Sequence, residues 1–384
     1  MRLAYLTRFD VSNRSTAPTL GGAGYASYYI ARNLQALGMS VLGVHGLTSG
    51  PSFAASMKAA FYRRVHHQNY NFAADPLTLK RQARQIGKKL APLDYDIVLS
   101  RLVLPLAHLQ LAKPIAVWTD GSARGLIDFY PQLTNLSERS RRETLAMERA
   151  ALEKCRLIIY SSDWAAQHAP ASIDRAKIKV VPFGPNCEAE ATLDEVCRNA
   201  HLKPMRPCRL LFVGGAWERK GGIVACQLAK ALCDAGYPTE LTIVGCTPKI
   251  PSDFAGIVKV VGYLHRSSPD GERAWRELMQ QSHFLILPSR ADCTPHVLME
   301  ANSYGVPCLT TDVGGIPTVI RNEVNGKLFA VDADIRDYRD FVITLLDDPN
   351  RYERLALSSF REFQTRLNWR VACENVKAMF DAIA

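Results

Sequence analysis

The sequence predicts an α/β protein of two similar domains, each built around a parallel β-sheet. The chain has 384 residues, more than one hydrophobic core usually supports. In both halves short apolar runs alternate with longer amphipathic stretches, which is the pattern of strands joined by helical crossovers. The pattern starts again after a polar, proline-containing stretch at 184–207, so this stretch is predicted to link the domains.

Strands are expected where short runs rich in β-branched residues or leucine end in polar or turn residues. In the first half these runs lie at 2–7, 40–44, 96–100, 114–119, 157–161 and 178–182, with helices at 24–37 and 138–154 among those between them. In the second half they lie at 210–213, 241–244, 258–261, 284–288 and 307–310, with helices at 222–235 and 298–304. A last helix at 369–383 is followed by no strand and is free to pack on either half. Ligands of parallel sheets bind beyond the carboxyl ends of the strands, so a cleft between the halves is the expected site.

Composition narrows the class of protein. Hydrophobic residues make up 47% and charged residues 22%, which is typical of globular proteins and argues against disorder. No apolar run reaches the roughly 18 residues that a bilayer span needs, and the first apolar run is cut by Arg8. The ten cysteines all lie between Cys155 and Cys373, without the spacing of a zinc site, so we expect buried thiols in a reducing, cytoplasmic compartment.

The positive charge is concentrated in the first half. Residues 1–185 hold 24 Lys and Arg against 12 Asp and Glu, whereas the remainder is nearly balanced. This asymmetry indicates an anionic partner, such as an anionic membrane surface, with basic stretches at 63–64, 80–89 and 139–142 as the contact. The alternative is a solubilising surface. No nucleic-acid-binding module is recognisable, so nucleic acid is not expected as a partner.

A glycine-rich loop precedes the first helix. Gly22 and Gly24 would let the backbone approach an anion at the helix N-terminus. The loop lies roughly fourteen residues beyond the first strand, and the second strand does not end in an acid, so the dinucleotide fingerprint of a nicotinamide dehydrogenase is not met. A plain flexible loop is the alternative.

A second glycine-rich turn follows the strand that opens the second half. Gly214 and Gly215 end the strand, and Arg219 and Lys220 stand at the loop tip as exposed cations. An arginine fork and a lysine point charge suit a diphosphate whose charge grows as a sugar leaves. The alternative is a solvated pair on a tight turn.

Two carboxylates flank the next such turn. Asp292 lies in the loop, and Glu300 lies eight residues later in the following helix. Carboxylates in these places accept hydrogen bonds from vicinal hydroxyls. They could equally be a helix N-terminal acid and a surface glutamate.

These residues together resemble the retaining glycosyltransferase family 4 of GT-B fold, over essentially the whole chain. The resemblance depends on a combination of motifs: Pro288-Ser289, Glu300-Ala301, Gly305-Val306-Pro307, Asp312-Val313-Gly314-Gly315-Ile316-Pro317 and Asn325-Gly326. It implies two Rossmann-like domains facing an inter-domain cleft. Residues 1–185 would form the acceptor-side domain, 186–366 the donor-binding domain, and 367–384 a helix packing back on the first domain.

The resemblance also assigns roles to residues. Glu300 would hold the ribose hydroxyls of a nucleotide-diphosphate sugar, and Asp292 would hold the donor sugar. Lys220, helped by Arg219, would hold the diphosphate. The remaining donor contacts would come from backbone and loop positions: Gly22, Gly24, Gly214, Gly215, Gly262, Tyr263, Cys293, Thr294 and Pro295.

Three positions depart from the family pattern. The first motif acid is Asp292 where relatives have Glu, and Gly214-Gly215 stands where relatives have Gly-Arg, so Arg219 would supply that cation. Many relatives place a His after the fourth strand, where this chain has Asp120. Asp120 could accept a hydrogen bond from a sugar hydroxyl or the acceptor, or could cap the following segment.

The expected activity is transfer of a sugar to the hydroxyl of a glycan or glycolipid acceptor, with retention, in cell-surface polysaccharide, lipopolysaccharide or glycolipid synthesis. The donor is a substrate, and neither a cofactor nor a metal ion is expected, because no paired acids indicate a divalent cation. A sugar-nucleotide epimerase, a phosphorylase or a non-catalytic nucleotide-sugar binding module of the same fold are the alternatives.

Overall fold

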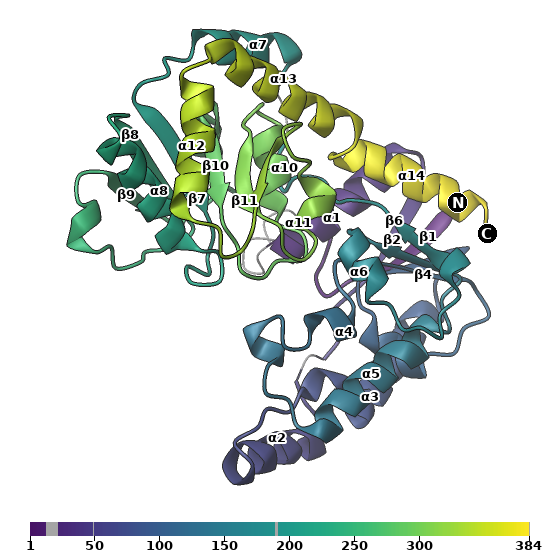
Figure 1. Ribbon diagram of the computed structural model, residues 1–384. Coiled ribbons are helices and arrows are strands. Elements are labelled where there is room, and N and C mark those ends of the chain that lie inside the picture. The colour runs from purple at the N-terminus through teal and green to yellow at the C-terminus, as the bar shows by residue number, and fades with distance from the viewer. Residues whose placement is uncertain (13–21, 49, 189–190, 384) are drawn as a thin grey trace. The chain divides into compact units, whose positions relative to one another are not determined.

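The computed structural model describes residues 1–12, 22–48, 50–188 and 191–383. The contacts divide the chain into two compact units (Figure 1). The first unit comprises Met1–Pro182 with Ala372–Ala384, and the second comprises Phe183–Val371. The last helix, α14 (Trp369–Asp381), therefore begins in the second unit and continues as part of the first. In the first unit the Cys373 thiol lies 3.9 Å from the Ile30 carbonyl of α1.

A six-stranded sheet forms the centre of the first unit, in the order β2-β1-β3-β4-β5-β6. All its pairings are parallel. The strands are β1 (Arg2–Leu6), β2 (Ser40–Val44), β3 (Ile97–Ser100), β4 (Ile115–Thr119), β5 (Leu157–Tyr160) and β6 (Ile178–Val180). Every residue of β3, β4 and β5 is buried, which explains why these runs read as continuously apolar.

Helices and short 3-10 turns surround that sheet. The helices are α1 (Gly22–Ala36), α2 (Phe53–Val65), α3 (Pro76–Leu90), α4 (Ala123–Leu126), α5 (Glu138–Leu152) and α6 (Asp163–Gln167). The 3-10 turns are η3 (Phe72–Ala74), η4 (Leu104–His108), η5 (Pro131–Leu133) and η6 (Arg175–Lys177). Helices α2, α3 and α5 begin at side-chain caps, Ser52, Asp75 and Ser137.

The second unit repeats this architecture with the strand order β12-β11-β10-β7-β8-β9, again all parallel. The strands are β7 (Cys208–Val213), β8 (Thr239–Val244), β9 (Val258–Gly262), β10 (Phe284–Leu287), β11 (Cys308–Thr311) and β12 (Gly326–Phe329). The helices are α7 (Leu193–Leu202), α8 (Gly222–Asp234), α9 (Pro269–Gln281), α10 (His296–Asn302), α11 (Ile316–Val319), α12 (Ile335–Leu346) and α13 (Pro349–Thr365), with a 3-10 turn η7 (Ser252–Phe254).

The predicted α/β class is confirmed, but the predicted linker is wrong in one respect. Within 184–207 the structure has a helix, α7, that packs against α13. Its N-terminus is a capping box: the Thr192 hydroxyl accepts from the Glu195 N–H, and the Glu195 carboxylate accepts from the Thr192 N–H. That Thr-x-x-Glu pattern was visible in the sequence and predicts the helix start.

Candidate active site

A glycine at the start of α8 brings the loop after β7 against the end of β10. Gly221 has a φ of +73°, and a Cβ at this position would lie 2.0 Å from the Pro288 carbonyl oxygen. Only glycine combines this left-handed backbone with so close an approach. The neighbouring residues Arg219 and Lys220 are therefore placed beside the loop that follows β10. A backbone hydrogen bond also joins the two loops, because the Arg290 N–H donates to the Arg219 carbonyl at 2.8 Å.

The side chains of Lys220 and Arg219 both approach one carboxylate oxygen of Asp292. The Lys220 ammonium donates to Asp292 Oδ2, and the Arg219 guanidinium lies 3.5 Å from the same oxygen. The side chains of Lys220 and Asp292 are only 13% and 8% exposed. The expectation of exposed cations at a loop tip is therefore wrong, because both cations contact the Asp292 carboxylate of the loop after β10. A compact group of two cations and one anion occupies the carboxyl ends of β7 and β10.

The loop that carries Asp292 is itself held tightly. The Asp292 carbonyl accepts from the Gly315 N–H at 3.0 Å, and the Ser289 hydroxyl lies 3.4 Å from Oδ2. Cys293 and Thr294 are buried, and Pro295 precedes the first turn of α10. The loop after β11 thus holds the backbone of Asp292, and Ser289 in its own loop contacts the carboxylate.

Glu300 lies inside α10 and is buried, so the alternative of a surface glutamate is wrong. Its Oε1 accepts from the Asn186 N–H at 3.1 Å and from the Arg266 guanidinium at 3.3 Å. Arg266 also lies 4.1 Å from the centroid of the Trp275 ring. Burial works against the charge of Arg266, but Glu300 and its other anionic neighbours outweigh it and raise the pKa of Arg266.

The turns after β7, β8 and β9 adjoin the same edge of the sheet. A Cβ on Gly215 would lie 3.6 Å from the Gly245 carbonyl, and the Gly245 N–H donates to the Gly262 carbonyl at 2.8 Å. Gly262 has a φ of +77°, and Gly214 N–H donates to the Val244 carbonyl. Tyr263, which follows, is 57% exposed. The predicted donor residues Gly214, Gly215, Gly262 and Tyr263 thus lie beyond the carboxyl ends of neighbouring strands.

The predicted site residues of the first unit are Gly22, Gly24 and Asp120. Gly22 begins α1 and Gly24 is buried in its first turn, whereas the part of the glycine loop at 13–21 lies outside the described residues. The approach of Gly22 and Gly24 to a donor stays a prediction. Asp120 directly follows β4 and is half-buried. The cap of the next helix is Ser122, whose hydroxyl accepts from the Gly125 N–H, so the capping alternative for Asp120 is wrong.

A pocket of about 340 Å³ opens at the carboxyl ends of the strands of the first unit. Arg8, Arg101 and Thr119 line it from the ends of β1, β3 and β4, and Thr144 and Glu148 line it from α5. Apolar side chains form much of the remaining wall: Leu47, Phe72, Leu102, Val103, Leu104, Pro105, Leu126 and Leu133. A mostly apolar pocket with a few polar groups is typical of a small-molecule site.

Glu148 is the unusual residue of this pocket. It is 3% exposed; one carboxylate oxygen accepts from the Ala123 N–H, and the other has no hydrogen-bond partner among the described residues. Burial raises its pKa to about 7, although the hydrogen bond from Ala123 opposes the shift. Below about pH 7 this carboxyl group is therefore mostly protonated and can donate a hydrogen bond.

Sequence reasoning missed Arg266 and Glu148. Arg266 is 34 residues from Glu300 in the chain, and no local pattern joins them. Glu148 had a signal: Ser140, Thr144 and Glu148 follow each other at helical spacing and are all buried, so α5 presents a polar row to the interior. Such a row indicates a pocket or a polar network, because buried polar groups need partners.

Within residues 1–12, 22–48, 50–188 and 191–383 no cluster of three or more His, Cys, Asp or Glu side chains is arranged to hold a metal ion. In the same ranges no helix combines the length and apolarity needed to cross a membrane.

Two family models match the chain in succession. The model for Glycosyltransferase Family 4 matches residues 20–189, and the model for Glycosyl transferases group 1 matches residues 194–359. Among curated proteins, the amylovoran biosynthesis glycosyltransferase AmsK of Erwinia amylovora is 25% identical over 193 residues, which are 47% of this chain and 46% of the relative. The chain thus spans less than half the length of this relative, as it does of others.

Solved structures match over the full length. Sucrose-phosphate synthase from Thermosynechococcus elongatus superimposes with a TM-score of 0.69 at 16% identity, covering 100% of this chain and 98% of the other. Anabaena HepE, solved in complex with UDP-glucose, has a TM-score of 0.63 at 14% identity and is covered completely, as is this chain. With two parallel six-stranded sheets and both family models in sequence, the chain belongs to glycosyltransferase family 4, and its fold is GT-B.

Proposed function

We propose that this protein is a retaining, metal-independent glycosyltransferase that moves a sugar from a nucleoside-diphosphate sugar to the hydroxyl of a glycan or glycolipid. The observation that carries the proposal is the convergence of Lys220 and Arg219 on Asp292 at the carboxyl ends of β7 and β10, with buried Glu300 on the helix that follows. The pair of cations matches a diphosphate, and the two acids match the hydroxyls on either side of it.

Each residue has a role in the proposed donor complex. The diphosphate takes the place of the Asp292 carboxylate beside Lys220 and Arg219, and this frees Asp292 to accept from a sugar hydroxyl. Glu300 accepts from the ribose hydroxyls, and Arg266 donates to the Glu300 carboxylate and orients it. The complex of HepE with UDP-glucose supports a donor of this chemical class.

In the proposed reaction the bond from the anomeric carbon to the diphosphate oxygen breaks, and the acceptor oxygen bonds to the same face of that carbon. The acceptor proton passes to the departing phosphate oxygen. Lys220 and Arg219 stabilise the charge that grows on the diphosphate, which is where preorganised charge lowers a barrier most. No step requires a metal ion or a covalent enzyme intermediate.

The pocket of the first unit is the proposed acceptor subsite. Its apolar wall suits the hydrocarbon face of a sugar or a lipid-linked glycan, and protonated Glu148 can donate to an acceptor oxygen. Arg8 and Arg101 at the strand ends suit an acceptor that carries phosphate. AmsK, named for the biosynthesis of amylovoran, supports a role in polysaccharide synthesis.

A panel of nucleotide-sugars, screened by thermal shift on the full chain, tests the donor assignment. One or a few donors are expected to raise Tm in proportion to the logarithm of their concentration, and UDP-sugars are the first to try. Incubation of the selected donor with and without lipid and glycan extracts then tests transfer, and the anomeric configuration of the product tests retention. A product formed without acceptor would indicate an epimerase, and binding without turnover would indicate a binding module.

The metal-independent step has its own test. Turnover in the presence of EDTA is expected to equal turnover without it. Complete loss of turnover that a divalent cation restores would contradict the proposed mechanism.

A further inference from the structure

Helix α2 of the first unit turns its apolar side chains outward. Of its thirteen residues only Ala55 is buried, whereas Phe53, Met57, Phe61 and Val65 are 82%, 59%, 51% and 58% exposed. From this stripe and the charge beside it, we propose that α2 docks the protein on the surface of an anionic lipid bilayer. The inference does not depend on the proposed reaction.

The stripe is continuous along the helix. Its four residues recur every fourth position, so they lie on one side, and at 1.5 Å per residue they extend over about 18 Å. An amphipathic helix of a soluble protein normally turns such a stripe toward the core. In Figure 1 α2 lies at the end of its unit away from the sheet, beside α3. Two more exposed apolar residues, Phe72 and Leu77, lie in η3 and α3, the segments that α2 contacts.

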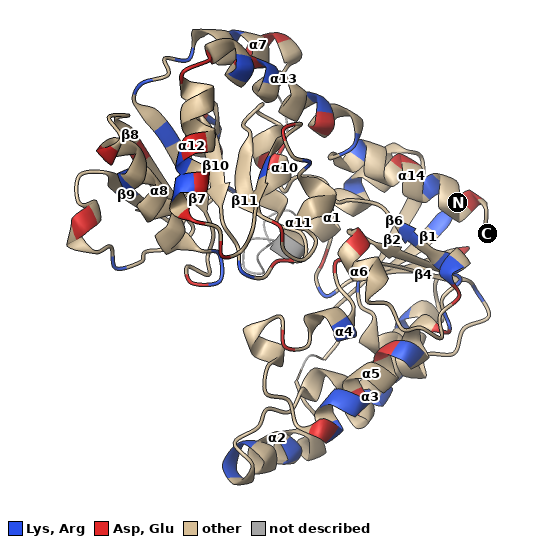
Figure 2. Ribbon diagram, in the orientation of Figure 1, with Lys and Arg blue, Asp and Glu red and all other residues tan. Residues whose placement is uncertain are grey.

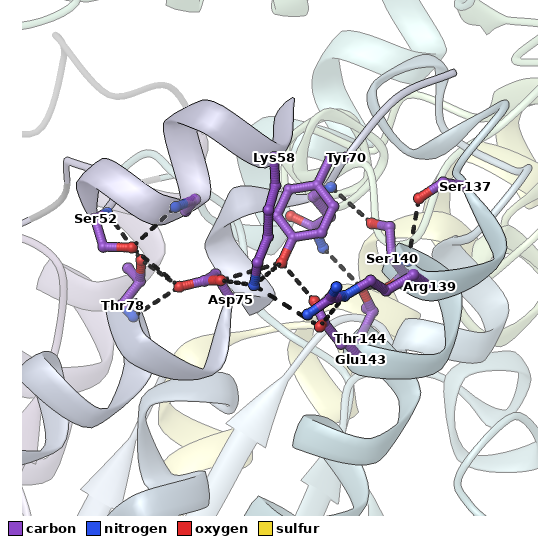
Figure 3. A network of polar contacts seen from close by, with 12 residues as sticks. Ser52, Lys58, Tyr70, Asp75, Thr78, Ser137, Arg139, Ser140, Glu143 and Thr144 are labelled. Atoms are coloured by element: carbon purple, nitrogen blue, oxygen red, sulfur yellow. Dashed lines mark hydrogen bonds and ion pairs between the residues drawn. The ribbon is translucent and has the colours of Figure 1, made fainter. Parts of the chain in front are cut away.

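A polar network holds the opposite side of α2 in place (Figure 3). The Lys58 ammonium donates to Asp75 Oδ2 at 2.7 Å and lies 3.8 Å from the Glu143 carboxylate. The Tyr70 hydroxyl donates to Glu143 and lies 3.1 Å from Asp75 Oδ2. Burial alone would raise the pKa of Asp75, but the hydrogen bond from Lys58 and those from its other neighbours outweigh burial and lower the pKa to about 2.

Two further contacts fix the ends of the helix. At its N-terminus the Ser52 hydroxyl donates to Asp75 Oδ1 at 3.1 Å and caps the first turn. Toward its C-terminus the Tyr62 ring stacks on the Tyr70 ring, with centroids 6.0 Å apart and planes within 5°. Polar contacts and ring stacking thus attach α2 to Tyr70 and Asp75, and none of these contacts involves the apolar stripe. The stripe is thus a fixed feature of the surface.

Exposed basic side chains lie beside the stripe and favour an anionic partner. Arg63 and Arg64 are exposed in the last turn of α2, and Lys80, Arg84 and Lys88 are exposed along α3. Figure 2 shows these basic segments at one end of α2 and on α3. By contrast, the basic stretch at 139–142 is paired: Arg139 with Glu143, Arg141 with Asp128 and Arg142 with Glu138.

Aromatic and aliphatic side chains beside arginines are the composition of helices that lie in the interface of an anionic bilayer. The excess of 24 basic over 12 acidic residues in residues 1–185 favours the same partner and opposes contact between two copies of this unit. A hydroxyl acceptor linked to lipid would be delivered at that surface.

Co-sedimentation of the full chain with vesicles tests the proposal. Vesicles of phosphatidylcholine with phosphatidylglycerol are expected to bind the protein, and pure phosphatidylcholine is expected to bind it at least about tenfold more weakly. The double variant Met57→Ser/Phe61→Ser removes the centre of the stripe and should weaken binding by about tenfold or more, with Tm unchanged because both side chains are exposed. Arg63→Glu/Arg64→Glu should weaken binding similarly and reduce its dependence on salt.

The second unit supplies matched controls. Leu202→Ser/Val331→Ser removes two apolar side chains that are 68% and 51% exposed, and Lys249→Glu/Lys259→Glu reverses two exposed charges; neither pair should change binding. Equal binding by the stripe variant and wild type would overturn the proposal. So would sedimentation velocity that shows a wild-type dimer, a monomeric stripe variant and no vesicle binding, because a second copy would then cover the stripe.

Discussion

The ammonium group of Lys220 is paired with the carboxylate of Asp292, and both side chains are nearly buried. The pair joins the loop after β7 to the loop after β10, two strands that are neighbours in the sheet. A bound diphosphate would compete with Asp292 for the lysine. In the proposed donor complex the pair would thus preorganise the two loops, and each residue would then have a separate partner on the donor.

A double-mutant cycle should detect this pair in the stability of the protein. For Lys220→Met, Asp292→Asn and the double variant, we expect a coupling free energy of about 1–3 kcal/mol in urea unfolding, because both groups are shielded from water. The exposed pair Arg336 and Asp334, with side chains 69% and 44% exposed, is the control and should couple far more weakly. Equal coupling for the two pairs would contradict the structural role.

Gly221→Ala should displace Lys220. The substitution places a methyl group 2.0 Å from the Pro288 carbonyl and strains a φ of +73°, so the loop must move. We expect a loss of more than about 2 kcal/mol in stability and at least tenfold in donor affinity. Gly236→Ala isolates the strain, because φ is +86° there and the added Cβ would have no described atom within 4 Å apart from its own chain neighbours. It should cost about 1–2 kcal/mol and leave donor affinity unchanged.

Arg266→Met should leave the Glu300 carboxylate buried without its cation. We expect a loss of about 3–5 kcal/mol in unfolding free energy, together with weaker binding of any nucleotide. Arg273→Met removes the exposed partner of Asp270 from the same region and should change stability by less than about 0.5 kcal/mol. A small effect of Arg266→Met on both quantities would show that Glu300 does not need this partner.

Glu148→Gln should change how stability depends on pH. Below the unfolded pKa of 4.5 the carboxyl group is protonated in both states, so wild type and variant should be similar. As pH rises from 4.5 to about 7 the unfolded chain releases this proton while the folded protein keeps it, and wild type loses stability that the variant retains. Above pH 7 the variant should be more stable by up to about 3 kcal/mol. A difference that is constant from pH 4 to 8 in urea unfolding would contradict a buried neutral Glu148.

Lys58→Met should loosen α2 on its unit. It leaves Asp75, which is fully buried, without its nearest cation, and we expect a loss of about 2–4 kcal/mol. Limited proteolysis should then cut within 53–65 sooner than in wild type. The control Lys80→Met removes an exposed lysine of α3 and should change neither the unfolding free energy nor the cleavage rate.

The strands and the site loops were predictable because both depend on local pattern. Buried parallel strands such as β4 and β10 are continuous apolar runs, and the loops that follow them carry glycine, charge and proline in recognisable order. The cap of α7 at Thr192 was equally local, and only the assumption that a polar stretch is a linker concealed it.

Three features were not predictable in this way. The pairing of Arg266 with Glu300 joins separate elements, and the burial of Lys220 depends on a loop 72 residues away. The apolar stripe of α2 has the spacing of a helix that faces the core, so the spacing alone would predict a buried stripe where the structure has an exposed one. Its true direction depends on Asp75, Tyr70 and Glu143, which lie outside the helix and attract Lys58 inward.

Calorimetric titration of wild type and Lys220→Met with a nucleoside diphosphate and with its nucleoside tests the central claim most directly. The site predicts that the diphosphate binds wild type at least about tenfold more tightly than it binds the variant, because a charge-assisted contact to phosphate is lost. It also predicts that the nucleoside binds both proteins equally. Equal affinity of both proteins for the diphosphate, or no binding by any diphosphate of the common bases, would contradict the assignment.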